Sequence, residues 1–311
     1  MRHGCRITTI FTILFLCLAV PASVAQKTPV FITASFQDRN GIFIENLTAS
    51  EVQVVEDGQA REIELMAKDE IPTVYGIIFQ RGMVSLQWER RRSTGIVSRG
   101  DAGLDSARDL AYEIVDKYLG RHPTWVGVYD SELEVALEPT ADGFRVKDAI
   151  QRLQDARMPE SFLYSALFSA VQKMAERSER RRVLIVLLEF VDSKTAGKLQ
   201  PLKNLLSSSN VELFTISFAT RLGSGPDGLS AAFSQSALGD LSHTTSGGAF
   251  FAADYRDHLD DISRRILNQI RTFYTFGFKS EATLDKATRL LVKCTVPGST
   301  VRHHPRVPVL R

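Results

Sequence analysis

The sequence is poor in the residues and motifs on which many enzymes and disulfide-stabilised proteins depend. Of its three cysteines, Cys5 and Cys17 fall within the first 25 residues, and Cys294 is alone in the remainder. A single cysteine cannot form an internal disulfide, so we expect the fold to depend on its hydrophobic core. Neither the Gly-x-Ser-x-Gly nucleophile elbow nor the His-Glu-x-x-His zinc motif occurs. These absences give no support for catalysis, and we expect a protein that is not an enzyme.

The sequence also has no apolar run long enough to cross a bilayer comfortably. The longest, Ile7 to Val20, is shorter than the roughly 20 residues of a membrane-spanning helix. Arg2 and Arg6 precede it, and small residues follow it up to Ala25. This order is typical of a secretory signal peptide (residues 1–25) with cleavage after Ala25; an uncleaved anchor is the alternative. We therefore expect a secreted or periplasmic protein without a membrane span after cleavage.

An excess of one charge is missing as well. Removal of the first 25 residues takes away two arginines and no acid, which lowers the formal net charge from +2 to 0. A neutral chain has no general attraction to nucleic acid or to an acidic membrane surface. We expect a protein partner and no nucleic acid.

Both ends of the mature chain have strand-like patterns. Val30 to Leu65 contains short β-type runs separated by Gly-containing turns, and Phe273 to Phe278 and Ala287 to Val296 are similar. A short β unit cannot bury enough surface alone, so we predict that the two ends pair into one small β domain. The predicted parts are an N-terminal β module (26–70), a central domain (71–271) and a C-terminal β segment (272–311).

The central part alternates strands with helices, which predicts an α/β fold with a doubly wound, mostly parallel sheet. Thr73 to Phe79 is an apolar run of the kind found in interior strands. Ligands usually bind at the loops that leave the carboxyl ends of such strands. The other expected strands are 125–129, 132–137, 182–190, 211–219 and 249–251, and the expected helices are 105–119, 145–153, 163–176, 200–207, 229–241 and 258–272.

Two stretches carry a family resemblance. Leu47 to Gly58 contains Leu-Thr-Ala-Ser and Val-Glu-Asp-Gly, and Leu241 to Phe278 contains Thr-Thr-Ser-Gly-Gly-Ala-Phe-Phe followed by a helix and Arg-Thr-Phe-Tyr-Thr-Phe. The chain thus resembles the von Willebrand factor A-type domains of a bacterial secreted subgroup. The resemblance implies a Rossmann-like A-type domain inserted in the small β domain. It also implies a binding function at the apical loops, where the family holds a divalent cation.

The first of those loops departs from the family pattern. The family motif is Asp-x-Ser-x-Ser, and the three ligand positions are taken here by Phe79, Arg81 and Met83. None of these side chains offers an oxygen to a cation. Arg81 is expected to lie near Glu189 and neutralise it, to accept the carboxylate of a partner, or to be a solvated loop residue.

The second and third loops retain some oxygen atoms. Ser161 stands at the position of the family threonine and Ser165 at that of a family aspartate. Glu189 stands at the aspartate position of the third loop, which continues to Asp192. Mg²⁺ prefers six oxygen ligands, which this set does not supply. We therefore expect a degenerate metal site without metal or other cofactor. The alternative is a metal-dependent adhesion domain whose Mg²⁺ is held by Ser161 and Glu189 and completed by a partner's carboxylate.

A basic cluster follows the first loop. Arg90, Arg91 and Arg92 are consecutive and lie close in sequence to Arg81. Such a run is expected to be a solvated face, with a docking surface for an acidic protein or polyanion as the alternative. The sequence as a whole predicts a protein–protein interaction module that binds an unidentified protein through its apical loops, with an acidic protein as one alternative.

Three further positions carry predictions about structure. Gly247 and Gly248 are expected to make a tight turn through positive φ. His303 and His304 lie in a proline-flanked tail and are expected to be exposed there; adventitious metal binding is the alternative. Cys294 lies in an alternating stretch and is expected to be a buried strand residue.

Overall fold

The computed structural model describes residues 28–68, 71–81, 83, 102–153, 161–189, 191, 196–218, 231–251, 259–282 and 288–307. The predicted signal peptide, the basic cluster from Arg90 to Arg92 and Asp192 lie outside these ranges. Within them, no helix is both long and apolar enough to cross a membrane.

The central domain is built on a six-stranded sheet in the order β10-β9-β8-β5-β6-β7. All neighbouring pairs are parallel except β6–β7, which is antiparallel. Every residue of β5 is buried, because β5 pairs with β6 on one side and β8 on the other. This confirms the interior strand expected from its apolar run. The strands are β5 (Thr73–Gln80), β6 (Thr124–Tyr129), β7 (Leu133–Thr140), β8 (Arg181–Leu188), β9 (Val211–Ser217) and β10 (Gly248–Phe251).

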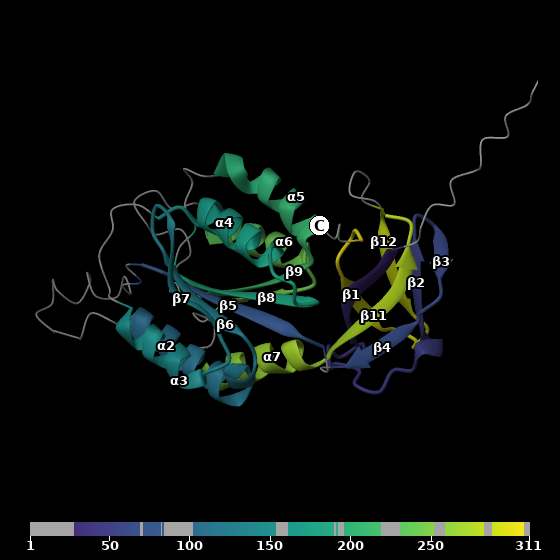
Figure 1. Cartoon of the computed structure of the whole chain (residues 1–311), viewed down its shortest axis with the longest axis horizontal. Coiled ribbons are helices and arrows are strands. Elements are labelled where there is room, and N and C mark those ends of the chain that lie inside the picture. The colour runs from purple at the N-terminus through teal and green to yellow at the C-terminus, as the bar shows by residue number, and fades with distance from the viewer. Residues whose placement is uncertain are drawn as a thin grey trace, which may run out of the picture.

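Helices cover both faces of this sheet (Figure 1). One face is covered by α2 (Ala102–Lys117), α3 (Gly143–Arg152) and α7 (Leu259–Arg271), and the other by α4 (Leu163–Ala175), α5 (Leu199–Ser209) and α6 (Ala231–His243). Because successive strand residues point to opposite faces, Ile77 and Phe79 pack towards α2, whereas Val74 and Ile78 pack towards α4. The doubly wound α/β fold is thus confirmed.

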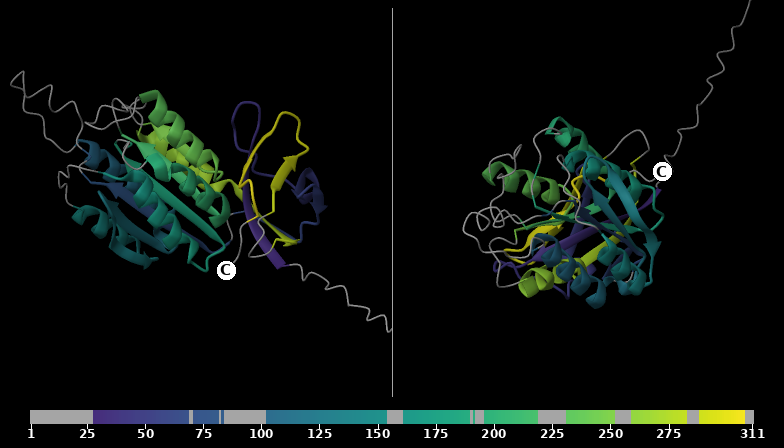
Figure 2. Two further views of the ribbon diagram at one scale, coloured as in Figure 1. Left: turned by 90° about the horizontal axis from the view of Figure 1, so that it is seen from above. Right: turned by 90° about the vertical axis from the view of Figure 1, so that its left-hand side faces the viewer.

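The two ends of the chain form a separate β domain, as predicted. Figure 2 shows the purple N-terminal strand beside yellow C-terminal strands. One sheet has the order β13-β1-β11-β4, and a second has the order β12-β2-β3. In the first, β1 pairs with β11 in antiparallel register from Thr28–Ser280 to Ser35–Phe273. The strands are β1 (Thr28–Gln37), β2 (Val52–Glu56), β3 (Gln59–Arg61), β4 (Leu65–Lys68), β11 (Phe273–Ser280), β12 (Leu290–Cys294) and β13 (Thr300–His303).

The central domain contacts this β domain at the end of the sheet opposite the apical loops. The guanidinium carbon of Arg180 lies 4.1 Å from the ring centre of Phe31, and that of Arg181 lies 4.8 Å from the ring centre of Phe273. Arg302 Nη1 donates to the carbonyl of Gly247 at 3.4 Å. Arginine–aromatic stacking therefore joins the two domains.

Three local predictions need correction. His304 is 1% exposed and not part of an exposed tail, because β13 pairs with β1 and brings the chain against the core. Cys294 is only partly buried. Gly247 does not have positive φ; that conformation falls to Ser246, at 63°. Gly247 is instead in close approach to backbone, since a Cβ there would lie 1.8 Å from the Leu213 carbonyl oxygen.

Candidate functional site

The site lies where β5 and β8 end, at the apical edge of the parallel sheet. The last two residues of β5 point to opposite faces. Phe79 is fully buried on the α2 side, in the same core cluster as Met83. Gln80 has the parity of Val74 and Ile78, whose side chains pack on the α4 side. The side chain that faces the second and third loops is therefore that of Gln80.

Gln80 connects these two loops through its amide. Its Nε2 donates to Ser161 Oγ at 2.8 Å, and its Oε1 accepts from the backbone N–H of Glu189 at 2.7 Å. Because a backbone N–H can only donate, the amide oxygen must face Glu189 and the NH₂ group Ser161. Gln80, Ser161 and Glu189 are 1%, 5% and 6% exposed. We call this arrangement the Gln80 bridge.

Backbone hydrogen bonds hold the surrounding loops. The N–H of Phe162, next to Ser161 and just before α4, donates to the carbonyl of Asp130 at 2.7 Å. The N–H of Phe218, after β9, donates to the carbonyl of Leu188 at 2.8 Å. The ends of β6, β8 and β9 are therefore tied to the loops that carry the bridge.

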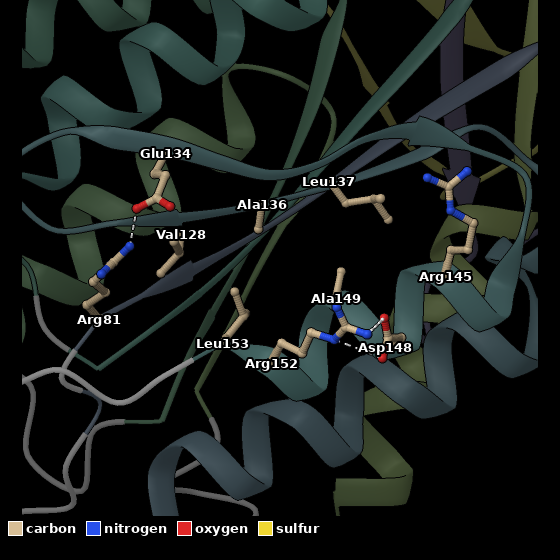
Figure 3. Close-up of a pocket in the computed structure, with 10 residues that line it drawn as sticks. All are labelled: Arg81, Val128, Glu134, Ala136, Leu137, Arg145, Asp148, Ala149, Arg152 and Leu153. Atoms are coloured by element: carbon tan, nitrogen blue, oxygen red, sulfur yellow. Dashed lines mark hydrogen bonds and ion pairs between the residues drawn. The ribbon is translucent and has the colours of Figure 1, made fainter.

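The side chain of Arg81 points away from the Gln80 bridge, towards the edge of the sheet formed by β6 and β7. Its backbone N–H donates to the carbonyl of Tyr129 at 2.8 Å. Its guanidinium lies 3.6 Å from the carboxylate of Asp130 and forms an ion pair with Glu134 of β7 (Figure 3). The expected pairing of Arg81 with Glu189 is therefore wrong, because the side chain follows β6 and β7 and not β8.

The remaining candidate residues are not gathered at the bridge. Ser165, one turn into α4, accepts a hydrogen bond from Lys198 Nζ at 3.0 Å. Asp192 and the arginines from Arg90 to Arg92 lie outside the described residues.

The sequence contained one signal for Gln80, namely a polar residue that ends an otherwise apolar strand. The family resemblance placed Phe79 at the first ligand position. A shift of one residue along a strand moves a side chain to the opposite face of the sheet. Phe79, which the resemblance indicated, and Gln80, which faces the loops, are therefore neighbours in sequence on opposite faces of the sheet.

The described residues at this site provide few free oxygen ligands for a cation. The Ser161 oxygen already accepts a hydrogen bond from Gln80, and Phe79 and Met83 are in the core. Within the described ranges, no three histidine, cysteine, aspartate or glutamate side chains lie close enough to share a metal ion. The Gln80 bridge is thus a buried connection between loops, made by hydrogen bonds between neutral groups.

Solved structures share this fold. Proximal thread matrix protein 1 from mussel byssus, described with a zinc-occupied MIDAS motif, matches 69% of this chain at 13% identity and a TM-score of 0.50. This chain covers 49% of that protein, about half of its length. A von Willebrand factor type A protein from Catenulispora acidiphila matches 92% of this chain and 75% of its own at 11% identity and a TM-score of 0.49.

A third match is BatB from Bacteroides thetaiotaomicron, over 64% of this chain and 98% of its own, at 12% identity and a TM-score of 0.46. No protein-family model and no curated protein matches the sequence. At these identities the likeness extends to the fold alone, which is von Willebrand A-like.

Proposed function

We propose that this chain is an exported, non-enzymatic protein-interaction module that binds its partner through the apical loops without a bound cation. The observation that carries the proposal is the Gln80 bridge. It joins Ser161 and the start of the third loop at Glu189. Proposed export rests on the basic, apolar and small-residue order of residues 1–25.

The bridge supplies by neutral hydrogen bonds the cross-connection that a cation would supply by charge. A primary amide donates and accepts, so it connects a hydroxyl to a backbone N–H without a counter-charge. A Mg²⁺ ion would instead require six oxygen ligands near 2.1 Å. For Ser161 to become a ligand, its hydrogen bond from Gln80 would have to break. No metal or cofactor is therefore part of the proposal.

The partner is proposed to be a protein with acidic groups. Arg81 lies beside the bridge at the apical edge and remains partly exposed while it pairs with Asp130 and Glu134. A guanidinium in this position recognises carboxylates through planar, charge-assisted hydrogen bonds.

Calorimetric titration of the exported chain with Mg²⁺, Mn²⁺ and Ca²⁺ tests the metal-free part of the proposal. We expect no heat of binding below millimolar concentrations. The Glu189→Gln variant is the matched control, because it removes a carboxylate and keeps the size. Sub-millimolar binding that disappears in Glu189→Gln would establish the alternative, a cation held by Ser161 and Glu189 and completed by a partner.

Capture of partners from a periplasmic extract tests the interaction itself. We expect a partner that is retained equally with and without EDTA and is reduced by Gln80→Ala. Gln200→Ala, an exposed glutamine on α5, serves as the control. Retention that requires a divalent cation contradicts the proposal.

A further inference from the structure

A groove runs beside the edge strand β7. It has a volume of about 630 Å³ and lies between β7 and helix α3 (Figure 3). Arg81 stands at its apical end, and Val128 and Leu137 form part of its apolar wall. This volume is within the range of clefts that accept a ligand or a few side chains of a partner.

The groove exists because small residues face it from both sides. Ala136 of β7 and Ala149 of α3 both line it. On α3, Arg145, Ala149 and Arg152 follow the spacing i, i+4, i+7 and so share one helix face. Ala149 thus separates two arginines that lie about 10 Å apart along the helix axis. Any larger residue at position 149 would fill the space between them.

The arginines that line the groove differ in whether they already form ion pairs. Arg81 is held by Asp130 and Glu134, and Arg152 pairs with Asp148 at 2.9 Å. In the described part of the chain, the guanidinium of Arg145 has no hydrogen bond or ion pair, and the residue is exposed. An exposed i, i+4 pair such as Arg152–Asp148 contributes little stability, so Arg152 can exchange its partner. One carboxylate could therefore engage Arg145 or Arg152 at small cost.

The same wall disfavours other classes of ligand. Glu134 and Asp148 also line the groove, and their negative charges would repel a polyanion such as nucleic acid. The side chains of Arg152 and Asp148 are 77% and 53% exposed, so the groove is open. A small molecule normally needs 70–90% of its surface buried. A chain segment that inserts individual side chains suits an open groove better.

We propose that this groove between β7 and α3 binds an extended segment of a protein partner that carries one carboxylate beside apolar side chains. The carboxylate pairs with Arg145 or Arg152, and the apolar side chains contact Val128, Leu137 and Ala149. The inference rests on the proposed function, in that the chain is a protein-binding module, and adds a contact surface separate from the Gln80 bridge.

Fluorescence anisotropy with labelled hexapeptides tests the groove directly. The probes are an alternating leucine–glutamate peptide, the corresponding leucine–glutamine peptide, and hexaglutamate, each titrated with the full exported chain. We expect the leucine–glutamate peptide to bind, and the other two to bind at least about tenfold more weakly, because each loses either the charge-assisted hydrogen bonds or the apolar contacts.

Two kinds of variant locate the binding. Arg145→Gln/Arg152→Gln removes the two positive charges, and Ala149→Trp fills the space without changing charge. Each variant is expected to bind the leucine–glutamate peptide about tenfold more weakly. Arg264→Gln, which removes an exposed arginine on α7, is the control and is expected to have no effect. Equal binding of hexaglutamate, or binding that neither groove variant weakens, overturns the inference.

The peptide and partner-capture experiments together distinguish a failure of the groove inference from a failure of the proposed function. Failure of the peptide to bind, together with EDTA-resistant partner capture that Gln80→Ala reduces, would reject the groove and leave the apical proposal intact. Peptide binding lost in the groove variants, together with cation-dependent partner capture, would support the groove and reject the apical proposal.

Discussion

Arg181 and Glu212 form a bidentate ion pair in the interior, at the end of the sheet that faces the β domain. Arg181 Nε lies 3.0 Å from Glu212 Oε1, and Nη2 lies 2.9 Å from Oε2. The two side chains are 2% and 1% exposed. Burial alone would lower the pKa of Arg181, but the Glu212 carboxylate raises it above the ordinary arginine value. The pair holds its charge in a place where an isolated arginine would be costly.

Glu212→Ala should therefore destabilise the protein by about 3–5 kcal/mol, because it leaves Arg181 buried without a counter-charge. Urea unfolding followed by circular dichroism measures the loss. Arg181→Met/Glu212→Leu should cost less than the single change, since it removes both charges and keeps most of the volume. The expectation is wrong if Glu212→Ala unfolds at the wild-type urea concentration.

Gln80→Ala should lower stability by about 1–3 kcal/mol, because it leaves the Glu189 N–H without its acceptor and removes the donor to Ser161. Thermal unfolding monitors the change, with Gln200→Ala as the exposed control. If Gln80→Ala had the melting temperature of the wild-type protein, the Gln80 bridge would contribute nothing to stability, contrary to this prediction.

Stability should fall with acid through His304. Burial, with a smaller contribution from His303, lowers the pKa of His304 from 6.5 to about 3. The folded state thus prefers the neutral ring, so its contribution is fully present above pH 6.5 and is lost as pH falls from 6.5 towards 3. Between pH 6.5 and pH 5 the loss should be about 2 kcal/mol.

Urea unfolding at several pH values checks this dependence, and His304→Leu is the comparison because it cannot titrate. The difference in stability between the two proteins should shift in favour of the variant as the pH falls. His303 also has a pKa lowered by burial, and the backbone carbonyl of His304 that contacts its ring is kept in both proteins. A difference that is constant from pH 7 to pH 4 contradicts the assignment.

Gly247→Ala should destabilise the protein by about 3 kcal/mol or more, since the new Cβ would meet the backbone carbonyl of Leu213, which cannot move aside as a flexible side chain can. Gly239→Ala is the matched control. Gly239 lies in α6 with nothing within 4 Å of an added Cβ. There alanine should stabilise by about 0.5–1 kcal/mol through helix propensity. Differential scanning calorimetry should show melting temperatures that move in opposite directions.

Much of the fold was predictable because it is recorded in local patterns. The apolar run from Thr73 identified β5, and apolar spacing placed α4 at 163–176 against the observed Leu163–Ala175. The pairing of the two chain ends followed from the need of short strands for partners. Individual contacts were less predictable. Arg81 was expected near Glu189 but contacts Asp130 and Glu134, since a flexible side chain is directed by neighbours that are distant in sequence.

The sequence by itself determined the order of strands and helices and the apolar character of β5, since these depend on residue type and periodicity. Only the tertiary structure decided that Gln80, and not Phe79, faces Ser161, and that α3 lies against β7 with a groove between them. The physical reason is that side chains on adjacent strand residues point to opposite faces. Which of the two meets a particular loop depends on how the sheet and helices are packed, and no local pattern contains that information.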